Sequence, residues 1–170
     1  IERAYRSGLQ TVGNGGLASI PVFDLTGIYN DDGGYHYQWF HFAVRERMAK
    51  ANGGSANHVM WRGGPAITEL FGQTTPIGVA VTNAASKQSW TTFINWMEAY
   101  KADTTSTSQR EKVIKNKPAN AVDGCFTKST TPQFIAETQT LSSQPNSQCN
   151  TLWPSWTAPR IESGGPVAAD

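Results

Sequence analysis

The chain has 170 residues, of which 38% are hydrophobic and 16% charged, and its formal net charge at pH 7 is +1. This length allows one domain with an ordinary core, while the near-zero charge and the scattered basic residues exclude an electrostatic footprint for nucleic acid or an anionic membrane. No apolar run approaches the roughly 20 residues of a membrane-spanning helix, so we expect a soluble protein.

The first predicted element is a strand at residues 19–25, SIPVFDL. This nearly continuous apolar run is typical of a strand buried on both faces, as in a parallel sheet. The Gly-rich stretch before it lacks the spacing of a dinucleotide or phosphate loop, so we expect turns there and no cofactor. Asp24 lies inside the apolar run, where an unpaired carboxylate is costly. We therefore expect Asp24 either to pair with an Arg or a catalytic His, or to point outward at the end of the sheet.

A helix is predicted next, over residues 37–54, with the stop supplied by two consecutive glycines. Its apolar residues fall on one helical stripe: Phe40, Val44, Met48 and Ala51. Its charged residues are expected on the solvent side: Arg45, Glu46, Arg47 and Lys50.

A second strand is predicted at residues 57–61, followed by a turn at residues 62–65, RGGP. A second helix is expected over residues 86–103 and a third, ended by a proline, over residues 106–117. The apolar stripe of the second helix has three- and four-residue spacing: Trp90, Phe93, Ile94, Met97 and Tyr100. This order of strands and helices predicts an α/β fold with parallel strands.

From Pro118 onward the sequence is rich in Gly, Pro, Ser, Thr and Asn and shows no convincing periodic segment. We expect residues 1–118 to form the main domain and residues 119–170 an irregular tail that packs on it, held by Trp153, Trp156 and the cysteines. Two confident strands do not make a stable sheet, so the missing strands are expected from another segment.

The two cysteines, Cys125 and Cys149, flank a polar segment with little apolar content. A disulfide across such a loop stabilises by about 3 kcal/mol in the chain-entropy model. Two free thiols, or two thiols that bind a metal ion, would give the same sequence pattern. Together with the many small polar residues, the pair favours a secreted or periplasmic protein.

Two acidic residues and a histidine follow the first strand in the stretch TGIYNDDGGYHYQW. In open α/β sheets, working residues gather just beyond the carboxyl ends of the strands. Asp31 lies there, where a carboxylate can orient an imidazole, and His36 follows as a candidate general base. The alternative is that the residues around Asp31 and Asp32 form a polar turn that caps the helix.

The other histidines and a metal site are further alternatives. The spacing of five between His36 and His41 points the two rings to different parts of a helix, and NDDGG lacks the ligands of a calcium loop, so we expect no metal. His41 lies between two phenylalanines and is expected to pack in the core. His58 could serve as the base, but a strand histidine between apolar neighbours is more often structural.

The stretches at residues 19–61 and 149–170 resemble a family of secreted bacterial proteins described only as a domain of unknown function, similar to α/β-hydrolases of the tannase and feruloyl esterase group. The resemblance covers most of the chain and implies the C-terminal, or processed, portion of a longer protein, whose upstream segment carries the nucleophilic serine. It implies His36 as the base and Asp31 as the acid. Asp24 and Asp32 are the next candidates for the acid. The sequence departs from the hydrolase pattern where MWRGGP replaces a Gly-His pair.

We therefore predict the C-terminal part of an α/β-hydrolase-like parallel sheet in a serine hydrolase that cleaves ester bonds, without a cofactor. The chain has no G-x-S-x-G elbow, so the serine must come from an N-terminal segment or a separate chain of the same protein. The substrate would be a small-molecule or polymeric ester. The alternative is a non-catalytic secreted carbohydrate-binding or structural module, with Trp153 and Trp156 as exposed stacking platforms.

Overall fold

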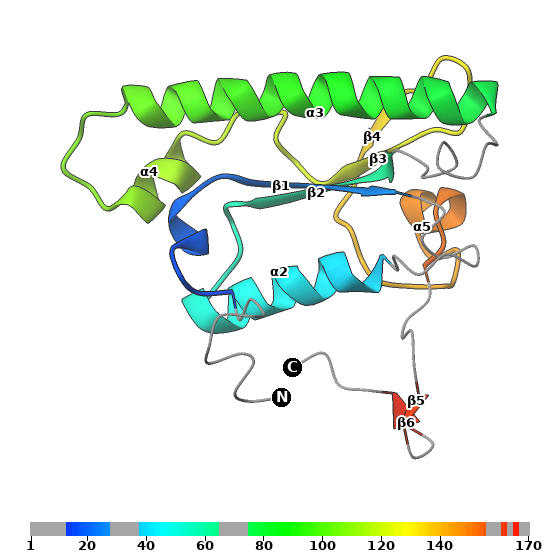
Figure 1. Cartoon of the computed structure of the whole chain (residues 1–170), viewed down its shortest axis with the longest axis horizontal. Helices are drawn as coiled ribbons and strands as arrows, with labels where there is room; N and C mark the ends of the chain where they lie inside the picture. The colour runs from blue at the N-terminus through cyan, green and yellow to red at the C-terminus, as the bar shows by residue number, and fades with distance from the viewer. Residues whose placement is uncertain (1–12, 28–37, 65–74, 156–160, 163–164, 167–170) are drawn as a thin grey trace.

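The computed structural model describes residues 13–27, 38–64, 75–155, 161–162 and 165–166 (Figure 1). The elements in chain order are the 3-10 turn η1 (Leu17–Ser19), β1 (Val22–Gly27), α2 (Trp39–Asn52), β2 (His58–Gly64), α3 (Pro76–Ala102), α4 (Gln109–Lys115), β3 (Gly124–Phe126), β4 (Phe134–Ala136), α5 (Gln148–Leu152), β5 (Ile161–Glu162) and β6 (Gly165–Pro166). In the described part of the chain, no helix is both long and apolar enough to cross a membrane.

Four strands form one sheet in the order β1-β2-β3-β4. β1, β2 and β3 run parallel, and β4 pairs with β3 in the antiparallel direction. This confirms the predicted α/β class with parallel strands and flanking helices. The count of strands from the sequence was too low, because β3 and β4 have three residues each and show no periodicity. They come from the region that was expected to be irregular.

The long helix α3 covers one face of the sheet, and the opposite face is turned to α2 (Figure 1). The α3 side is apolar: Val59 and Trp61 of β2 are buried against Val81, Ala85 and Trp96 of α3. Such a layer between a helix and a sheet supplies most of the hydrophobic stabilisation of an α/β unit.

α3 begins at Pro76, earlier than the predicted start at residue 86. Thr75 caps it by accepting a hydrogen bond from the backbone N–H of Gly78 at 3.0 Å, and proline suits the first helical position because it needs no N–H donor there. The buried face also differs from the predicted stripe: Val81, Ala85, Ser89, Thr92 and Trp96. Small residues on this face let the helix lie close to the sheet, and Trp90 of the predicted stripe remains 67% exposed.

α4 lies within the helix predicted for residues 106–117. It starts at a capping box, in which Ser108 accepts from the backbone N–H of Glu111 and the Glu111 carboxylate accepts from the backbone N–H of Ser108. The indole N–H of Trp96 donates to the carbonyl of Val113 at 2.8 Å. This bond joins α4 to α3.

The predicted apolar stripe of α2 was right for Met48 and wrong for Phe40 and Ala51, which are exposed. Phe42, Ala43 and Met48 are buried, whereas Phe40 is 50% exposed. The physical reason is that α2 turns part of its polar side to the sheet, where Arg45 is hydrogen-bonded to Asp123. Arg45 therefore does not lie on a solvent face, as the sequence had indicated.

β2 runs on through Gly64, where the sequence predicted a turn. Gly63 has φ +94°, and a Cβ there would lie 3.0 Å from the ring of Trp153, so only glycine fits. Trp153 is 1% exposed and its indole N–H donates to the carbonyl of Phe126 at 2.8 Å. Trp153 holds the C-terminal region on the sheet, as predicted, but is not an exposed platform for a sugar. Trp156 lies outside the described residues.

Cys125 of β3 and Cys149 of α5 form a disulfide, and both are buried. The sequence had left open whether these thiols are bridged. The bridge joins α5 to the sheet.

Replacing Cys125 and Cys149 together by serine should lower the free energy of unfolding by about 3 kcal/mol, because the bridge closes a loop with a sequence separation of 24. Urea denaturation followed by tryptophan fluorescence measures the difference. As a control, a reductant should destabilise the parent protein and leave the double variant unchanged. Equal stability of the parent and the double variant would contradict a structural role for the bridge.

A candidate acid–base site between the sheet and α2

The face of the sheet turned to α2 carries polar side chains, in contrast to the apolar α3 side. Successive side chains of a strand point to opposite faces. Phe23 and Leu25 pack against the apolar core on the α3 side, whereas Asp24 and His58 bond to side chains of α2. Five ionisable groups meet there: Asp24, His41, Arg45, His58 and Asp123.

Asp24 lies near the centre of this group, in the middle of β1. Its Oδ1 accepts a hydrogen bond from Nδ1 of His41 at 2.6 Å, and its Oδ2 lies 3.5 Å from Nε2 of His58. Burial alone would raise the pKa of Asp24, but the bonds from His41 and His58 outweigh burial and hold that pKa well below its ordinary value of 3.8. Asp24 is therefore ionised at neutral pH.

His41 is the residue of α2 that faces Asp24. Its Nδ1–H is committed to the carboxylate, and its ring is 30% exposed. Within the described residues, no hydrogen bond to Nε2 of His41 occurs. A carboxylate on Nδ1 fixes the tautomer that leaves Nε2 unprotonated, so this nitrogen can accept a proton. A carboxylate and an imidazole paired in this way can accept and return a proton.

His58 holds the second oxygen of Asp24. Its Nδ1 accepts a hydrogen bond from Nε of Arg45 at 3.0 Å. A guanidinium only donates, so this network assigns the ring proton of His58 to Nε2, the nitrogen that faces Asp24. The distance of 3.5 Å is at the outer limit of a hydrogen bond, and Nε2 has no closer partner among the described residues.

Arg45 continues the network to the residue that precedes β3. Its guanidinium donates two hydrogen bonds to Asp123, at 2.6 and 2.8 Å. Asp123 also accepts from the backbone N–H groups of Met60 and Gln139. Burial would raise the pKa of Asp123, but the bonds from Arg45 and these N–H groups lower it. Arg45 is thereby fixed in the orientation that holds His58.

Arg62 extends the polar layer toward α5. It is fully buried, and its guanidinium donates to Gln38 at 2.7 Å, to Asn150 at 2.6 Å and to the carbonyl of Trp153. These bonds link β2 to the start of α2 and to the C-terminal region. The layer beneath α2 is thus continuous and hydrogen-bonded.

The predicted site residues are only partly described by the structure. His36, Asp31 and Asp32 lie outside the described residues, so their roles stay predictions. Asp24 pairs with a histidine, one of the two outcomes expected for it. His41, expected to pack in the core, is instead that partner.

Sequence reasoning missed His41, Arg45 and Asp123 as members of one site. A signal existed for two of them, because His41 and Arg45 are four residues apart and so share one side of α2. Asp123 gave no signal, since it precedes a strand of three residues in a region without periodicity.

Across the described residues, no group of three His, Cys, Asp or Glu side chains is arranged to hold a metal ion. The distance of 2.6 Å between His41 and Asp24 is a direct hydrogen bond that leaves no room for an ion between the two atoms. The arrangement is suited to moving a proton.

Comparison with known proteins places the chain in one family. Residues 1–170 match DUF6351, described as a tannase-like family of unknown function. No curated protein and no solved structure matches the chain.

Replacing Asp24 by Asn should destabilise the protein by about 3 kcal/mol at pH 7, because the buried His58 and the partly exposed His41 lose their charged partner. The pKa of Asp24 is lower in the folded state than in the unfolded state, so its contribution is complete above pH 3.8 and is lost as the pH falls further. The difference in unfolding free energy between parent and variant should therefore shrink below about pH 4. Urea denaturation across this range measures it.

The control is Glu98→Gln on the exposed side of α3, which should follow the parent protein at every pH. A difference between Asp24→Asn and the parent that is constant with pH, or that grows in acid, would contradict the ionised pair.

Proposed function

Because the chain belongs to the tannase-like family of unknown function DUF6351, we propose that it is part of a serine hydrolase of α/β-hydrolase type that cleaves ester bonds. The observation that carries the proposal is the Asp24–His41 pair, with an oxygen-to-nitrogen distance of 2.6 Å and a histidine side chain that is 30% exposed. In this proposal Asp24 is the acid and His41 is the base.

The chemistry requires a nucleophile that the described residues do not present to His41. A serine hydroxyl from an N-terminal segment, or from a separate chain of the same protein, would donate its proton to Nε2 as its oxygen attacks the ester carbonyl. His41 then returns that proton to the leaving alcohol. Water, deprotonated by the same nitrogen, then attacks the acyl carbon, and His41 returns that proton to the serine oxygen as the serine ester bond breaks and the acid leaves. Asp24 stays ionised throughout and stabilises the imidazolium.

The network around Asp24 supports this role because it orients the carboxylate from the side that does not face His41. Arg45 donates a hydrogen bond to His58, and Nε2 of His58 lies 3.5 Å from the oxygen of Asp24 that His41 does not use. A fixed carboxylate keeps the His41 ring in one tautomer and one orientation, which a general base requires.

The disulfide supports a further part of the proposal, namely that the protein works in an oxidising compartment as a secreted or periplasmic enzyme. Cys125 and Cys149 are joined and buried, and such structural bridges persist mainly outside the reducing cytosol. The esters it cleaves would be small molecules or polymers available there.

The test replaces His41 by Gln in the full-length protein, since Gln can still donate a hydrogen bond to Asp24 but is not a base. We expect kcat/KM for aryl and alkyl esters to fall by roughly 100- to 10,000-fold. The melting temperature should change by no more than about 4 °C. A fluorophosphonate label identifies the serine in the parent protein.

The matched control is His36→Gln, which changes the rival base in the same way and should retain activity. Loss of activity in His36→Gln together with retention in His41→Gln would contradict the assignment and favour the pair of His36 and Asp31. A full-length protein that takes up no label and cleaves no ester would contradict the hydrolase itself.

A further inference from the structure

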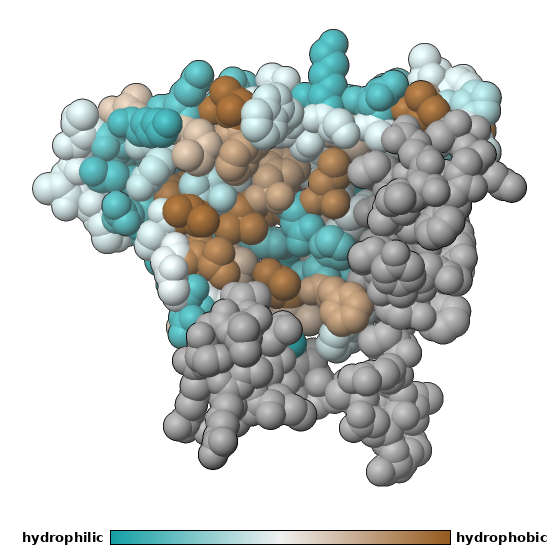
Figure 2. Space-filling model, in the orientation of Figure 1, coloured by the Kyte–Doolittle hydropathy of each residue, from teal (hydrophilic) through white to brown (hydrophobic). Residues whose placement is uncertain are grey.

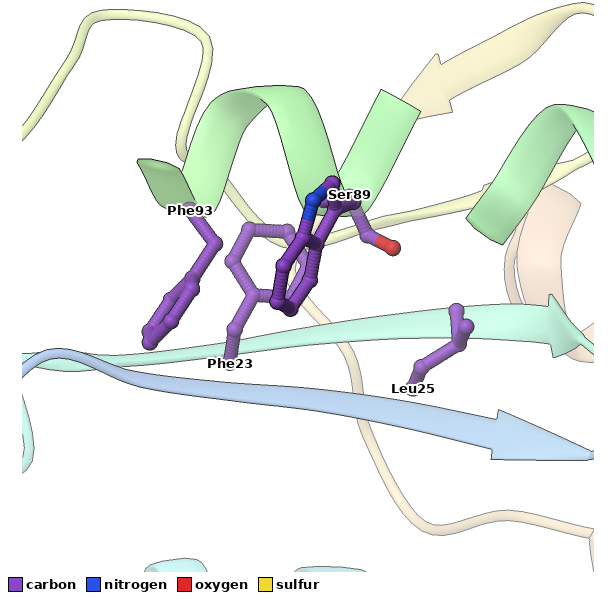
Figure 3. Close-up of a pocket in the computed structure, with 5 residues that line it drawn as sticks. Phe23, Leu25, Ser89 and Phe93 are labelled. Atoms are coloured by element: carbon purple, nitrogen blue, oxygen red, sulfur yellow. The ribbon is translucent and has the colours of Figure 1, made fainter. Parts of the chain in front are cut away.

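Arg62 of β2 lies on the same side of the sheet as Asp24. Trp61 packs in the apolar core on the α3 side, and successive side chains of a strand alternate between the faces, so Arg62 points to the α2 side. Figure 3 shows Phe23 and Leu25 of β1 extending toward α3 in the same way as Trp61. Figure 2 shows hydrophilic residues between the strands and α2, where the polar layer reaches the surface. Arg62 itself is fully buried, so it acts only through its neighbours.

The start of α2 is joined to Arg62 by a side chain. Gln38, at the N-cap of α2, makes no side-chain hydrogen bond to the first turn of the helix. Instead its side-chain oxygen accepts from Nε of Arg62 at 2.7 Å, and its side-chain nitrogen donates to the carbonyl of Pro154 at 3.4 Å. A first turn without a side-chain cap is where a helix frays. The bonds of Gln38 to other parts of the protein therefore hold this turn in place of a cap.

His41 lies in that first turn. Its backbone N–H donates to the carbonyl of Gln38 at 3.0 Å. The next residue, Phe42, is buried, and the centre of its ring lies 5.9 Å from the guanidinium carbon of Arg62. Arg62 thus contacts α2 on both sides of His41 along the helix. A displacement of Arg62 would shift both contacts and turn the imidazole away from the Asp24 oxygen that it meets at 2.6 Å.

The other end of the Arg62 guanidinium is held by the C-terminal region. Nη1 donates to Oδ1 of Asn150 at 2.6 Å, and Nη2 donates to the carbonyl of Trp153. The amide of Asn150 is oriented in turn, because its nitrogen donates to Thr140 at 3.0 Å and to Asn146 at 2.7 Å. A guanidinium is planar and its donors are fixed relative to one another. Fixing two of its nitrogens therefore fixes the direction of the third, Nε, toward α2.

A buried cation at this place is better suited to orientation than to stability. Four amide or carbonyl oxygens of the described residues accept from Arg62. Desolvation offsets much of the free energy of such bonds, and an apolar side chain of similar volume often stabilises a fold equally well. An apolar side chain, however, has no directional bonds with which to hold the first turn of a helix.

We propose that Arg62 is a positioning residue for His41, and that α5 sets the orientation of Arg62 through Asn150. The contacts run from α5 through Arg62 to the first turn of α2, and so to the imidazole that meets Asp24. The C-terminal region, which the sequence indicated to be an irregular tail, thereby takes part in aligning the base. The expected effect on turnover rests on the proposed function, whereas the effect on the geometry of the His41 pair does not.

The test replaces Asn150, which is 1% exposed and lies on α5, away from any contact with a substrate. In the full-length protein, Asn150→Leu removes the acceptor for Arg62 at similar volume, whereas Asn150→Asp keeps an acceptor; both lose the donor bonds of the amide. We expect Asn150→Leu to lower kcat for an aryl ester by roughly 10- to 100-fold with little change in KM. Asn150→Asp should have a kcat at least roughly five-fold above that of Asn150→Leu.

The spectroscopic readout is the Nδ1–H proton of His41 in protein labelled with ¹⁵N-histidine. In Asn150→Leu this proton should exchange with solvent at least roughly 10-fold faster than in the parent, because the bond to Asp24 opens more often. The matched control is Val113→Ala in α4, which removes buried apolar volume outside the Arg62 network. It should lower the melting temperature and leave both kcat and the His41 proton unchanged.

Parent values of kcat and of His41 proton exchange in folded Asn150→Leu would overturn the proposal. Equal losses of kcat in Asn150→Leu and Val113→Ala would also overturn it, since destabilisation alone would then explain them. If the His41 proton responds as expected but the parent cleaves no ester, the positioning of His41 stands and the hydrolase fails.

A second pair of variants covers the case in which Asn150→Leu does not fold. Gln38→Met and Gln38→Glu make the same comparison at the other end of Arg62, because Glu can accept from its Nε and Met cannot. Gln38→Met should then lose kcat and protection of the His41 proton, and Gln38→Glu should recover part of both. Equal behaviour of these two variants would overturn the proposal.

Discussion

A single carboxylate, that of Asp24, determines how the polar half of this molecule is arranged. It lies inside an apolar strand, where an ion is costly unless it is paired. His41 and His58 lie on its two oxygens, at 2.6 and 3.5 Å. The other ring nitrogen of His58 accepts a hydrogen bond from Arg45, and Arg45 also donates to Asp123. Keeping Asp24 ionised and hydrogen-bonded therefore accounts for three features. These are the side of α2 that faces the sheet, the position of the loop before β3 and the tautomer of His58.

The two faces of the sheet therefore have different roles: one stabilises the fold, and the other orients charged groups. On the α3 side, Trp61, Trp96 and their neighbours form an apolar layer that stabilises the fold through burial. On the α2 side, the same strands present charged groups. Their hydrogen bonds to one another fix the orientation of these side chains and reduce the free-energy cost of burying them. The disulfide and Trp153 hold the C-terminal region on this framework. A rigid apolar layer beneath an oriented polar one suits a site at which a proton is transferred.

The sequence predicted the helices and strands that are long enough to show a clear hydrophobic period. It also located Asp24, the central residue of the site. An apolar strand containing Asp24 already implied a specific partner, because the cost of an unpaired carboxylate is general. Which histidine fills that role depends on how α2 is rotated, and the flanking phenylalanines Phe40 and Phe42 made His41 read as core. The helix turned its polar side inward because Asp24 and Asp123 were there to receive it, which is information from distant parts of the chain. For α3, two stripes were available, and the one with small residues packs on the sheet.

The most direct test of this account is the protonation of the two imidazole rings, observed by heteronuclear NMR at alkaline pH. The account predicts that His41 carries its proton on Nδ1, in a strong hydrogen bond to Asp24, and that His58 carries its proton on Nε2. A proton on Nε2 of His41, or on Nδ1 of His58, would contradict it, because His41 would then lack a basic nitrogen facing outward or His58 would be unable to accept from Arg45.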